Sequence, residues 1–403
     1  MRIASISLFS ILAMSSLAGS LYAQSVSTPL WTGENIESKV LGETRVLKIS
    51  LPQDYDAREY AAERYPVLIV LDAQWDVPFT AAVANARALA WPGTNAPAIP
   101  GLIIVGIETP DRTRFRDMTL SPVGDAAKQI NGAGGGATFL RFLATELLPY
   151  IASRYRTQST TILAGHSLTG AFAAWAFGQA PDLFTGVIDT WLNTDGFAGR
   201  QVVDGLRSRS KSGRLFVTNG AAELGMDSGI KSFIEAVRAR PAPAWALEYQ
   251  RLDEVSHSHT QTLGMIPGLR YVFRPVSLAG YQIEFDGDEP VLAKFNKVFD
   301  SIREKYLRGA RDLGLPERLP LSFLLGQSRR YQGLTMAPLR LRLCDEITTS
   351  YPKLWHGYDC AGDAQALLGR GTEAVKNYRR AADVARDAGD VNADRLLRKA
   401  EKP

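Results

Sequence analysis

Continuous apolar runs constrain the fold of this chain more than any other feature of its sequence. The runs "YPVLIVLD" (65–72) and "GLIIVGIE" (101–108) lack the polar and apolar alternation of a strand with one face in water. They are typical of strands that are covered on both faces. A third apolar run, 161–164, follows, and stretches of helical character at 79–91 and 138–155 separate the three. This alternation predicts a mostly parallel sheet with helices on both faces.

Four further segments read as strands. The stretch "TRVLKISL" (44–51) alternates polar and apolar residues, as a half-buried strand does. The others are "FTGVIDTW" (184–191), "RLFVTNG" (214–220) and "ALEYQRL" (246–252). This pattern stops near Arg274, so we expect the α/β domain to cover residues 24–275.

The C-terminal part of the chain reads as helical. Residues 276–289 carry turn residues without a clear period and are interpreted as a linker. From Val291, apolar residues recur every three or four positions, which predicts an amphipathic helix. Further on, Ala374, Tyr378 and Ala381 have the spacing of a tetratricopeptide helix pair. We therefore predict a small helical appendage over 290–403, either tetratricopeptide-like or an ordinary helical hairpin packed on the main domain.

The first 23 residues read as a secretory signal. Arg2 precedes an apolar run from Ile3 to about Ala18, and small residues near Ala23 resemble a cleavage site. Five serines between Ser5 and Ser16 make the segment too polar for a typical membrane anchor. An uncleaved anchor or a buried N-terminal helix is the alternative. We predict an exported protein, periplasmic or secreted, that is not inserted in the membrane after cleavage.

Charge and cysteine content limit the possible partners. The formal net charge is +4 and falls to +3 without Arg2, and no cluster of Lys and Arg concentrates it. Nucleic acid is therefore not an expected partner. Cys344 and Cys360 are the only thiols and could form a local disulfide in an oxidising compartment, or stay buried and unpaired.

Ser167 stands where the third apolar run gives way to an Ala-rich helical segment, in "LAGHSLTGAF". A tight strand-to-helix turn projects such a serine above the sheet, and small flanking residues permit the turn. The first backbone N–H groups of the helix, that of Leu168 included, then face the same point and can stabilise an oxyanion. A helix N-cap serine is the alternative. Thr169 replaces the second glycine of a G-x-S-x-G motif, so its β-branched side chain must find room.

A nucleophilic serine needs a base and an orienting acid. The chain has four histidines, and His166 is inside the turn while His356 lies in the appendage. The base is therefore His257 or His259, both in the loop after the last strand. The loop that follows the strand 214–218 carries two candidate acids, Glu223 and Asp227, and either could instead be a solvated charge. The order serine, acid, histidine is that of an α/β-hydrolase.

The region 65–273 resembles the putative-esterase family of α/β-hydrolases, which includes enterochelin-type ferric-siderophore esterases, S-formylglutathione hydrolases and mycolyltransferases. The resemblance rests on "YPVLIVLDAQW", "IIVGIETPDRTRFRDMTLSP", "GGGATFLRFLATELLPYIASRYRT", "LAGHSLTGAFAAWAF", "APDLF" and "SHSHTQTLGMIPGLRYVF". It implies an α/β-hydrolase fold, and exported members of this family can carry tetratricopeptide-like helices after the hydrolase domain.

The resemblance also assigns roles. It implies that Ser167 is the nucleophile, Glu223 the acid and His257 the base, with His259 two residues out of register. It further implies that the backbone N–H groups of Leu168 and Gln74 form the oxyanion hole. Two departures stand out. The usual "GHSLGG" is "GHSLTG" here, and "DTWLNTDG" (189–196) replaces an expected "S-P-S-x-W" segment, which suggests a changed substrate pocket.

The segment "PDRTRFRDMTLSP" places Arg112, Arg114 and Arg116 close together with Asp111 and Asp117. Arginines in a loop could recognise an anionic or catecholate substrate. Because acids are interspersed among them, we favour salt bridges within the segment.

These observations predict an exported serine esterase that forms an acyl-enzyme on Ser167 and acts on a small-molecule ester, such as a siderophore. The chemistry requires no cofactor, and the scattered His and Cys residues predict no metal site. Two alternatives remain. One is an acyltransferase with the same triad, and the other is a non-catalytic binding protein of the same fold whose C-terminal helices contact a protein partner.

Overall fold

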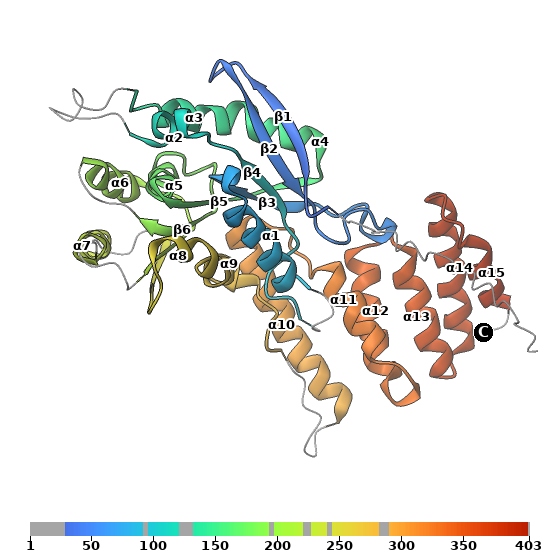
Figure 1. Ribbon diagram of the computed structural model, residues 1–403. Helices are drawn as coiled ribbons and strands as arrows, with labels where there is room; N and C mark the ends of the chain where they lie inside the picture. The colour runs from blue at the N-terminus through green and yellow to red at the C-terminus, as the bar shows by residue number, and fades with distance from the viewer. Residues whose placement is uncertain are drawn as a thin grey trace, which may run out of the picture.

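The computed structural model describes residues 29–91, 96–120, 132–192, 197–220, 227–239, 244–281 and 290–401. Within these ranges, eight strands form one sheet in the order β1-β2-β4-β3-β5-β6-β7-β8 (Figure 1). The predicted signal segment and most of the predicted linker lie outside the described residues. The strands are β1 Thr32–Ser38, β2 Glu43–Ser50, β3 Tyr65–Val70, β4 Ile103–Ile107, β5 Thr157–Ser167, β6 Gly186–Leu192, β7 Arg214–Gly220 and β8 Ala246–Leu252.

The sheet is mostly parallel. Strands β4, β3, β5, β6, β7 and β8 pair in parallel, whereas β1 and β2 form an antiparallel hairpin that joins the sheet at β4. The predicted mostly parallel sheet is therefore confirmed. Every residue of β3 and β4 is buried, as their continuous apolar sequences predict. Strand β1 was not expected from the sequence.

Helices cover both faces of the sheet and bury two separate apolar layers. Alternate residues of β3 point to opposite faces, so Leu68 and Val70 contribute to one layer and Val67 and Ile69 to the other. The first layer is completed by α1 Val77–Leu89 and α9 Met265–Val272, and the second by the helices between β4 and β8. Those helices are α2 Asp111–Met118, α3 Gly136–Phe142, the π-helical segment η5 Leu143–Leu147, α4 Leu148–Arg154, α5 Leu168–Gln179, α6 Phe197–Ser208 and α7 Asp227–Arg238.

Two segments that the sequence suggested as loops are helical. The arginine-rich stretch after β4 forms α2, and the stretch after β8 begins α8 His257–Leu263 at the first of its two histidines. Both helices are short and polar, so they lack the long apolar stripe that identifies a helix from sequence. Short 3-10 turns occur at η1 Arg58–Tyr60, η2 Ala73–Trp75, η6 Arg274–Val276 and η7 Leu334–Met336.

The C-terminal helices share the core of the α/β domain. Phe295, Phe299 and Ile302 of α10 belong to the same buried apolar layer as α1 and α9. The packing is close, because a β-carbon at Gly309 would lie 2.2 Å from the carbonyl oxygen of Pro275. The helices are α10 Val291–Leu313, α11 Leu321–Arg330, α12 Ala337–Ser350, α13 Trp355–Leu367, α14 Gly371–Asp387 and α15 Ala393–Glu401. From α11 onward they form a row that extends away from the sheet (Figure 1).

Cys344 of α12 and Cys360 of α13 form a disulfide, with their Cα atoms 5.6 Å apart. The bond joins consecutive helices of the C-terminal row, so it acts as the local cross-link that the sequence suggested as one of two possibilities. Among the helices in the described ranges, none combines the length and the apolar character needed to span a bilayer.

Candidate active site

Ser167 is the last residue of β5, and α5 begins at the next residue, Leu168. Its backbone has φ 59° and ψ −120°, a combination that residues with a β-carbon rarely adopt. Such strain persists only where the surrounding structure enforces it, and it occurs most often at functional sites. The side chain is only partly buried. The structure therefore places Ser167 at a sharp strand-to-helix corner, as predicted.

The glycine before this corner is required by packing. A β-carbon at Gly165 would lie 2.2 Å from the carbonyl oxygen of Thr169, well inside any allowed contact. Only glycine lets the end of β5 approach the first turn of α5 this closely. The first glycine of the motif thus has a direct steric role.

Thr169 fits in place of the second glycine because its hydroxyl is used. The residue is fully buried, and its Oγ1 accepts a hydrogen bond from the backbone N–H of His166 at 2.9 Å. The same oxygen lies 3.0 Å from Oδ2 of Asp72 and 2.9 Å from the carbonyl oxygen of His166. The β-branched side chain is therefore accommodated without displacing the corner.

The loop 72–76 follows β3 and contains Gln74. Asp72 and Asp76 bracket this 72–76 loop with φ angles of 59° and 48°, so its backbone is fixed in two sparsely populated conformations. The side-chain oxygen of Gln74 accepts a hydrogen bond from the backbone N–H of Thr109 at 2.9 Å. Nζ of Lys48 donates to the carbonyl oxygen of Ala73 at 2.8 Å. The loop is thus held to β2 and to the end of β4, which lie on one side of β3 in the sheet.

His257 lies beside the corner. Its ring is 4.4 Å from the ring of His166, measured between centroids, and its carbonyl oxygen accepts a 2.9 Å hydrogen bond from Nε2 of His166. Burial and then the proximity of His257 lower the pKa of His166 to about 4. His166 is therefore neutral at physiological pH, and it fixes the first turn of α8 next to Ser167.

His259 has a different environment. It is exposed, and its Nδ1 lies 2.8 Å from the hydroxyl oxygen of Ser256. Of the two candidate bases, the structure thus brings His257 to the corner residue His166, whereas His259 faces solvent.

The candidate acid Glu223 lies outside the described residues, and Asp227 is the first residue of α7. The strand that precedes both, β7, ends at Gly220, where a β-carbon would lie 2.0 Å from the carbonyl oxygen of Val255. The end of β7 therefore packs directly against the segment that leads into His257.

Asp189 of β6 is a buried acid that the sequence did not single out as a site residue. It pairs with Gly165 in the sheet and is fully buried, and among the described residues neither carboxyl oxygen has a hydrogen-bond partner. Burial alone raises its pKa well above the usual value. The segment "DTWLNTDG" (189–196) therefore begins with a protonated acid next to β5. Residues 193–196 of this segment lie outside the described ranges.

We predict that Asp189→Asn stabilises the fold at alkaline pH. The unfolded carboxyl ionises near pH 3.9 while the folded one stays protonated to a much higher pH, so the free energy of unfolding falls as pH rises between the two pKa values. The amide does not titrate and escapes this loss. Thermal melts should show a higher Tm for the variant near pH 8 and a smaller difference near pH 4. A difference that does not change with pH would contradict the assignment of a neutral acid.

The arginine-rich segment forms ion pairs both within itself and with the 72–76 loop. Arg116 contacts Asp117 within the segment at 2.7 Å, as the sequence suggested. Arg114 instead binds Asp72 in the 72–76 loop, with Nε and Nη2 each 2.9 Å from one carboxylate oxygen. Its guanidinium carbon also lies 4.9 Å from the ring centroid of Trp75. In the described parts of the chain, no group of three or more His, Cys, Asp or Glu side chains could hold a metal ion.

Residues 38–190 match a family model described as Putative esterase. The match covers less than half of the chain and shows that this region is similar to that esterase family. The matched range includes the 72–76 loop, α2 and Ser167, and it ends before His257. The match supports a hydrolase that acts on esters. No curated protein matches the sequence.

Solved structures with a similar fold cover most of this chain. An IroE-like serine hydrolase from Shewanella oneidensis aligns with a TM-score of 0.62 and 21% identity, over 81% of this chain and 99% of that one. An uncharacterised protein from Capnocytophaga ochracea gives a TM-score of 0.55 and 17% identity, over 91% and 99%. The BES protein from Bacillus cereus gives a TM-score of 0.52 and 20% identity, over 62% of this chain and 97% of that one. These likenesses confirm the α/β-hydrolase fold, and the first two alignments extend into the C-terminal helices.

Sequence reasoning missed part of the candidate site. Asp72 was considered only as the residue that ends a strand, and Arg114 only as a member of a charged loop. The carboxylate of Asp72 is buried and accepts hydrogen bonds from Arg114, Thr109 and Thr169. A carboxylate at the end of a fully buried strand was the one available signal, because a buried charge requires partners.

Proposed function

We propose that this chain is an exported serine esterase with Ser167 as its nucleophile. The observation that carries the proposal is the backbone of Ser167, which is strained at a strand-to-helix corner. Next to this corner lies the pair His166 and His257. A hydroxyl held above the sheet, a nearby imidazole and the N-terminus of a helix are the parts that acyl transfer requires.

In the proposed reaction, the imidazole of His257 takes the proton of Ser167 as the serine oxygen attacks the ester carbonyl carbon. The backbone N–H groups of Leu168 and Gln74 stabilise the negative oxygen of the tetrahedral intermediate. His257 then donates the proton to the departing alcohol, which leaves an acyl-enzyme. Water attacks this ester with His257 as base, and the acid product and the free serine are released.

Glu223 is the proposed partner that orients His257, with Asp227 as the second candidate. Support comes from the close packing of Gly220 on the backbone before His257, because it starts the acid-bearing loop beside the histidine. A carboxylate in this position would keep the imidazole in the correct tautomer and stabilise its protonated form.

Export is part of the proposal. The N-terminal segment has the charge, apolar run and small-residue end of a secretory signal. The disulfide between Cys344 and Cys360 is consistent with an oxidising compartment such as the periplasm.

The proposed substrates are small esters with a planar acyl group, which includes but does not require siderophores. Trp75 directly follows Gln74 and is 44% exposed. Arg114, itself fixed by Asp72, lies over its ring. An acyl carbonyl bound at the backbone N–H of Gln74 would therefore lie near this exposed indole, which favours stacking of a planar group.

The test is a panel of aryl esters that differ in acyl group. We expect hydrolysis of acetyl and benzoyl esters, and we expect Trp75→Ala to lower kcat/KM for the benzoyl ester about three- to tenfold more than for the acetyl ester. The same reactions with an added alcohol separate hydrolysis from acyl transfer, because a transferase would yield the new ester as the main product. Equal losses on both substrates would exclude Trp75 from acyl recognition.

A further inference from the structure

The hydroxyl of Thr169 joins two parts of the chain that must be aligned with each other for the proposed reaction. It accepts a hydrogen bond from the backbone N–H of His166, the residue that precedes Ser167. It also contacts Oδ2 of Asp72 at the start of the 72–76 loop. An ionised carboxylate can only accept, so a hydrogen bond between the two uses the hydroxyl proton of Thr169. One hydroxyl thus links the turn that carries Ser167 to the loop that carries Gln74.

Asp72 is itself fixed by further hydrogen bonds, chiefly from Arg114 and Thr109. Arg114 binds both of its oxygens in a fork, and the hydroxyl of Thr109 donates to it at 2.6 Å. The carboxylate is only 1% exposed. A buried bidentate ion pair with additional donors is rigid, because each partner has a single favourable geometry. The contact point for Thr169 is therefore preorganised.

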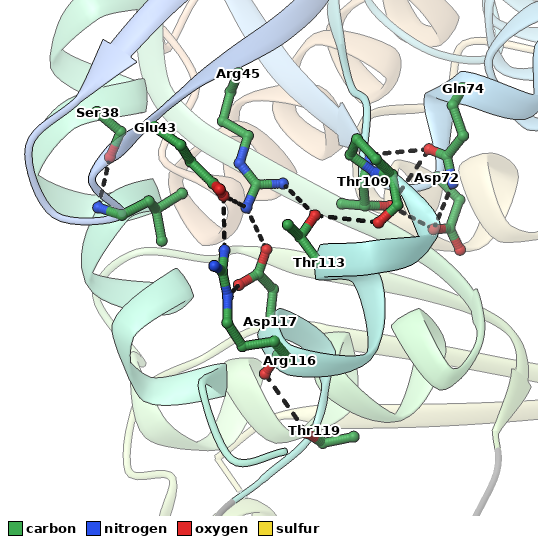
Figure 2. Close-up of polar contacts among 12 residues, drawn as sticks. Ser38, Glu43, Arg45, Asp72, Gln74, Thr109, Thr113, Arg116, Asp117 and Thr119 are labelled. Atoms are coloured by element: carbon green, nitrogen blue, oxygen red, sulfur yellow. Dashed lines mark hydrogen bonds and ion pairs between the residues drawn. The ribbon is translucent and has the colours of Figure 1, made fainter. Parts of the chain in front are cut away.

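Helix α2 extends this network to the opening hairpin of the sheet. Figure 2 shows Asp72, Gln74 and Thr109 in one group and Arg45, Arg116 and Asp117 in another, with Thr113 of α2 between them. Arg45 donates to Thr113 at 3.3 Å and forms an ion pair with Asp117, and both members of this pair are at most 2% exposed. Arg45 of β2 thus holds α2, the helix that carries Arg114, against the sheet.

We propose that Thr169 is a positioning residue that holds the Ser167 corner against the 72–76 loop through the carboxylate of Asp72. This positioning role rests on the proposed function, because it concerns the alignment of Ser167 with the backbone N–H of Gln74. A glycine at this position would leave the His166 N–H and Oδ2 of Asp72 each without this partner. The threonine is therefore a functional substitution in the corner motif.

The experiment compares kcat and KM of the full chain on a short-chain aryl ester for hydroxyl-deleting variants. Thr169→Val keeps the shape and removes the hydroxyl, and we expect kcat to fall by about 10- to 100-fold because small misalignments of reacting groups are costly. KM should change by less than about threefold, since ground-state binding is retained. Thr169→Ser restores the hydroxyl and should recover kcat to within about threefold of the wild type. Asp72→Asn should lower kcat in parallel with Thr169→Val.

Thr160→Val is the matched control. Thr160 is a buried threonine at the other end of β5, and its hydroxyl donates to the carbonyl oxygen of Leu313 at 2.7 Å. This variant should lower Tm without changing kcat. If Thr169→Val does not fold, Thr169→Gly removes the same hydroxyl with no steric cost, and we expect the same loss of kcat.

Two outcomes would overturn the proposal. One is a wild-type kcat in Thr169→Val or Thr169→Gly, and the other is a failure of Thr169→Ser to recover the rate. If the wild-type chain does not hydrolyse the ester at all, the proposed function fails and the positioning role fails with it. If the wild type is active and the Thr169 variants match Thr160→Val, only the positioning role fails.

Discussion

Replacing Ser167 with alanine should lower kcat on a short-chain aryl ester by roughly 10⁵- to 10⁶-fold, because the acyl-enzyme cannot form without the hydroxyl. Binding should persist, since Ser167 is one partly buried residue of a preformed site. Tm should change little, because the alanine must adopt the same strained backbone and the serine is not a core residue. Steady-state kinetics and a thermal melt on the same preparation measure both.

Ser159→Ala is the matched control for this prediction. Ser159 lies on the same strand but is exposed at its other end, where its hydroxyl is 3.5 Å from the carbonyl oxygen of Gly314. This variant should retain full activity. Residual turnover by Ser167→Ala above about one per cent of the wild type would show that the hydroxyl is not the nucleophile.

His257→Ala should have the second largest effect, a loss of about 10²- to 10⁴-fold in kcat/KM, because general base catalysis typically contributes that much. His259→Ala should retain activity to within about twofold, since the side chain faces solvent and contacts Ser256. The two residues are neighbours on one short helix, so each variant is a control for the other. The measurement is kcat/KM on the aryl ester as a function of pH.

The comparison also separates a structural from a catalytic role. His257 contacts His166 through its ring and through its backbone carbonyl oxygen, and alanine keeps the hydrogen bond to the carbonyl oxygen. The first turn of α8 should therefore remain in place in His257→Ala, and the loss should come from the missing imidazole. Equal activity of the two alanine variants would refute the assignment of His257 as the base, and a larger loss in His259→Ala would reverse it.

The sheet and the corner could be predicted from the sequence because their signals are local. A fully buried strand such as β3 requires a continuous apolar run, and a strained corner requires glycine at position 165, so both leave a mark within a few residues. For the same reason, the strand predictions agree with β2 to β8 to within a few residues at most ends.

The network around Asp72 could not be predicted because its members are distant in sequence. Thr169 and Asp72 are 97 residues apart, and Arg114 and Asp72 are 42 apart. Spacing along the chain gives no signal for such contacts. From the sequence, Thr169 was therefore only a bulky residue at a glycine position, and Arg114 was only one charge of a loop. Their roles emerge only when β3, α2 and β5 meet at the carboxyl ends of the parallel strands.

For a related reason, the sequence could not predict that the C-terminal helices share the core of the main domain. The amphipathic stripe of α10 predicts a buried face but does not identify what covers it. In the structure this stripe joins the same apolar layer as α1 and α9, so α10 completes the α/β core. Removing the C-terminal helices would thus expose part of that core.

The most direct test of the central claim is covalent trapping of the nucleophile. Incubation of the wild-type chain with a fluorophosphonate, followed by intact mass measurement and peptide mapping, should show a single adduct on Ser167 and none on Ser167→Ala. An unmodified wild-type chain, or an adduct on another residue, would contradict the account of Ser167 as an activated nucleophile.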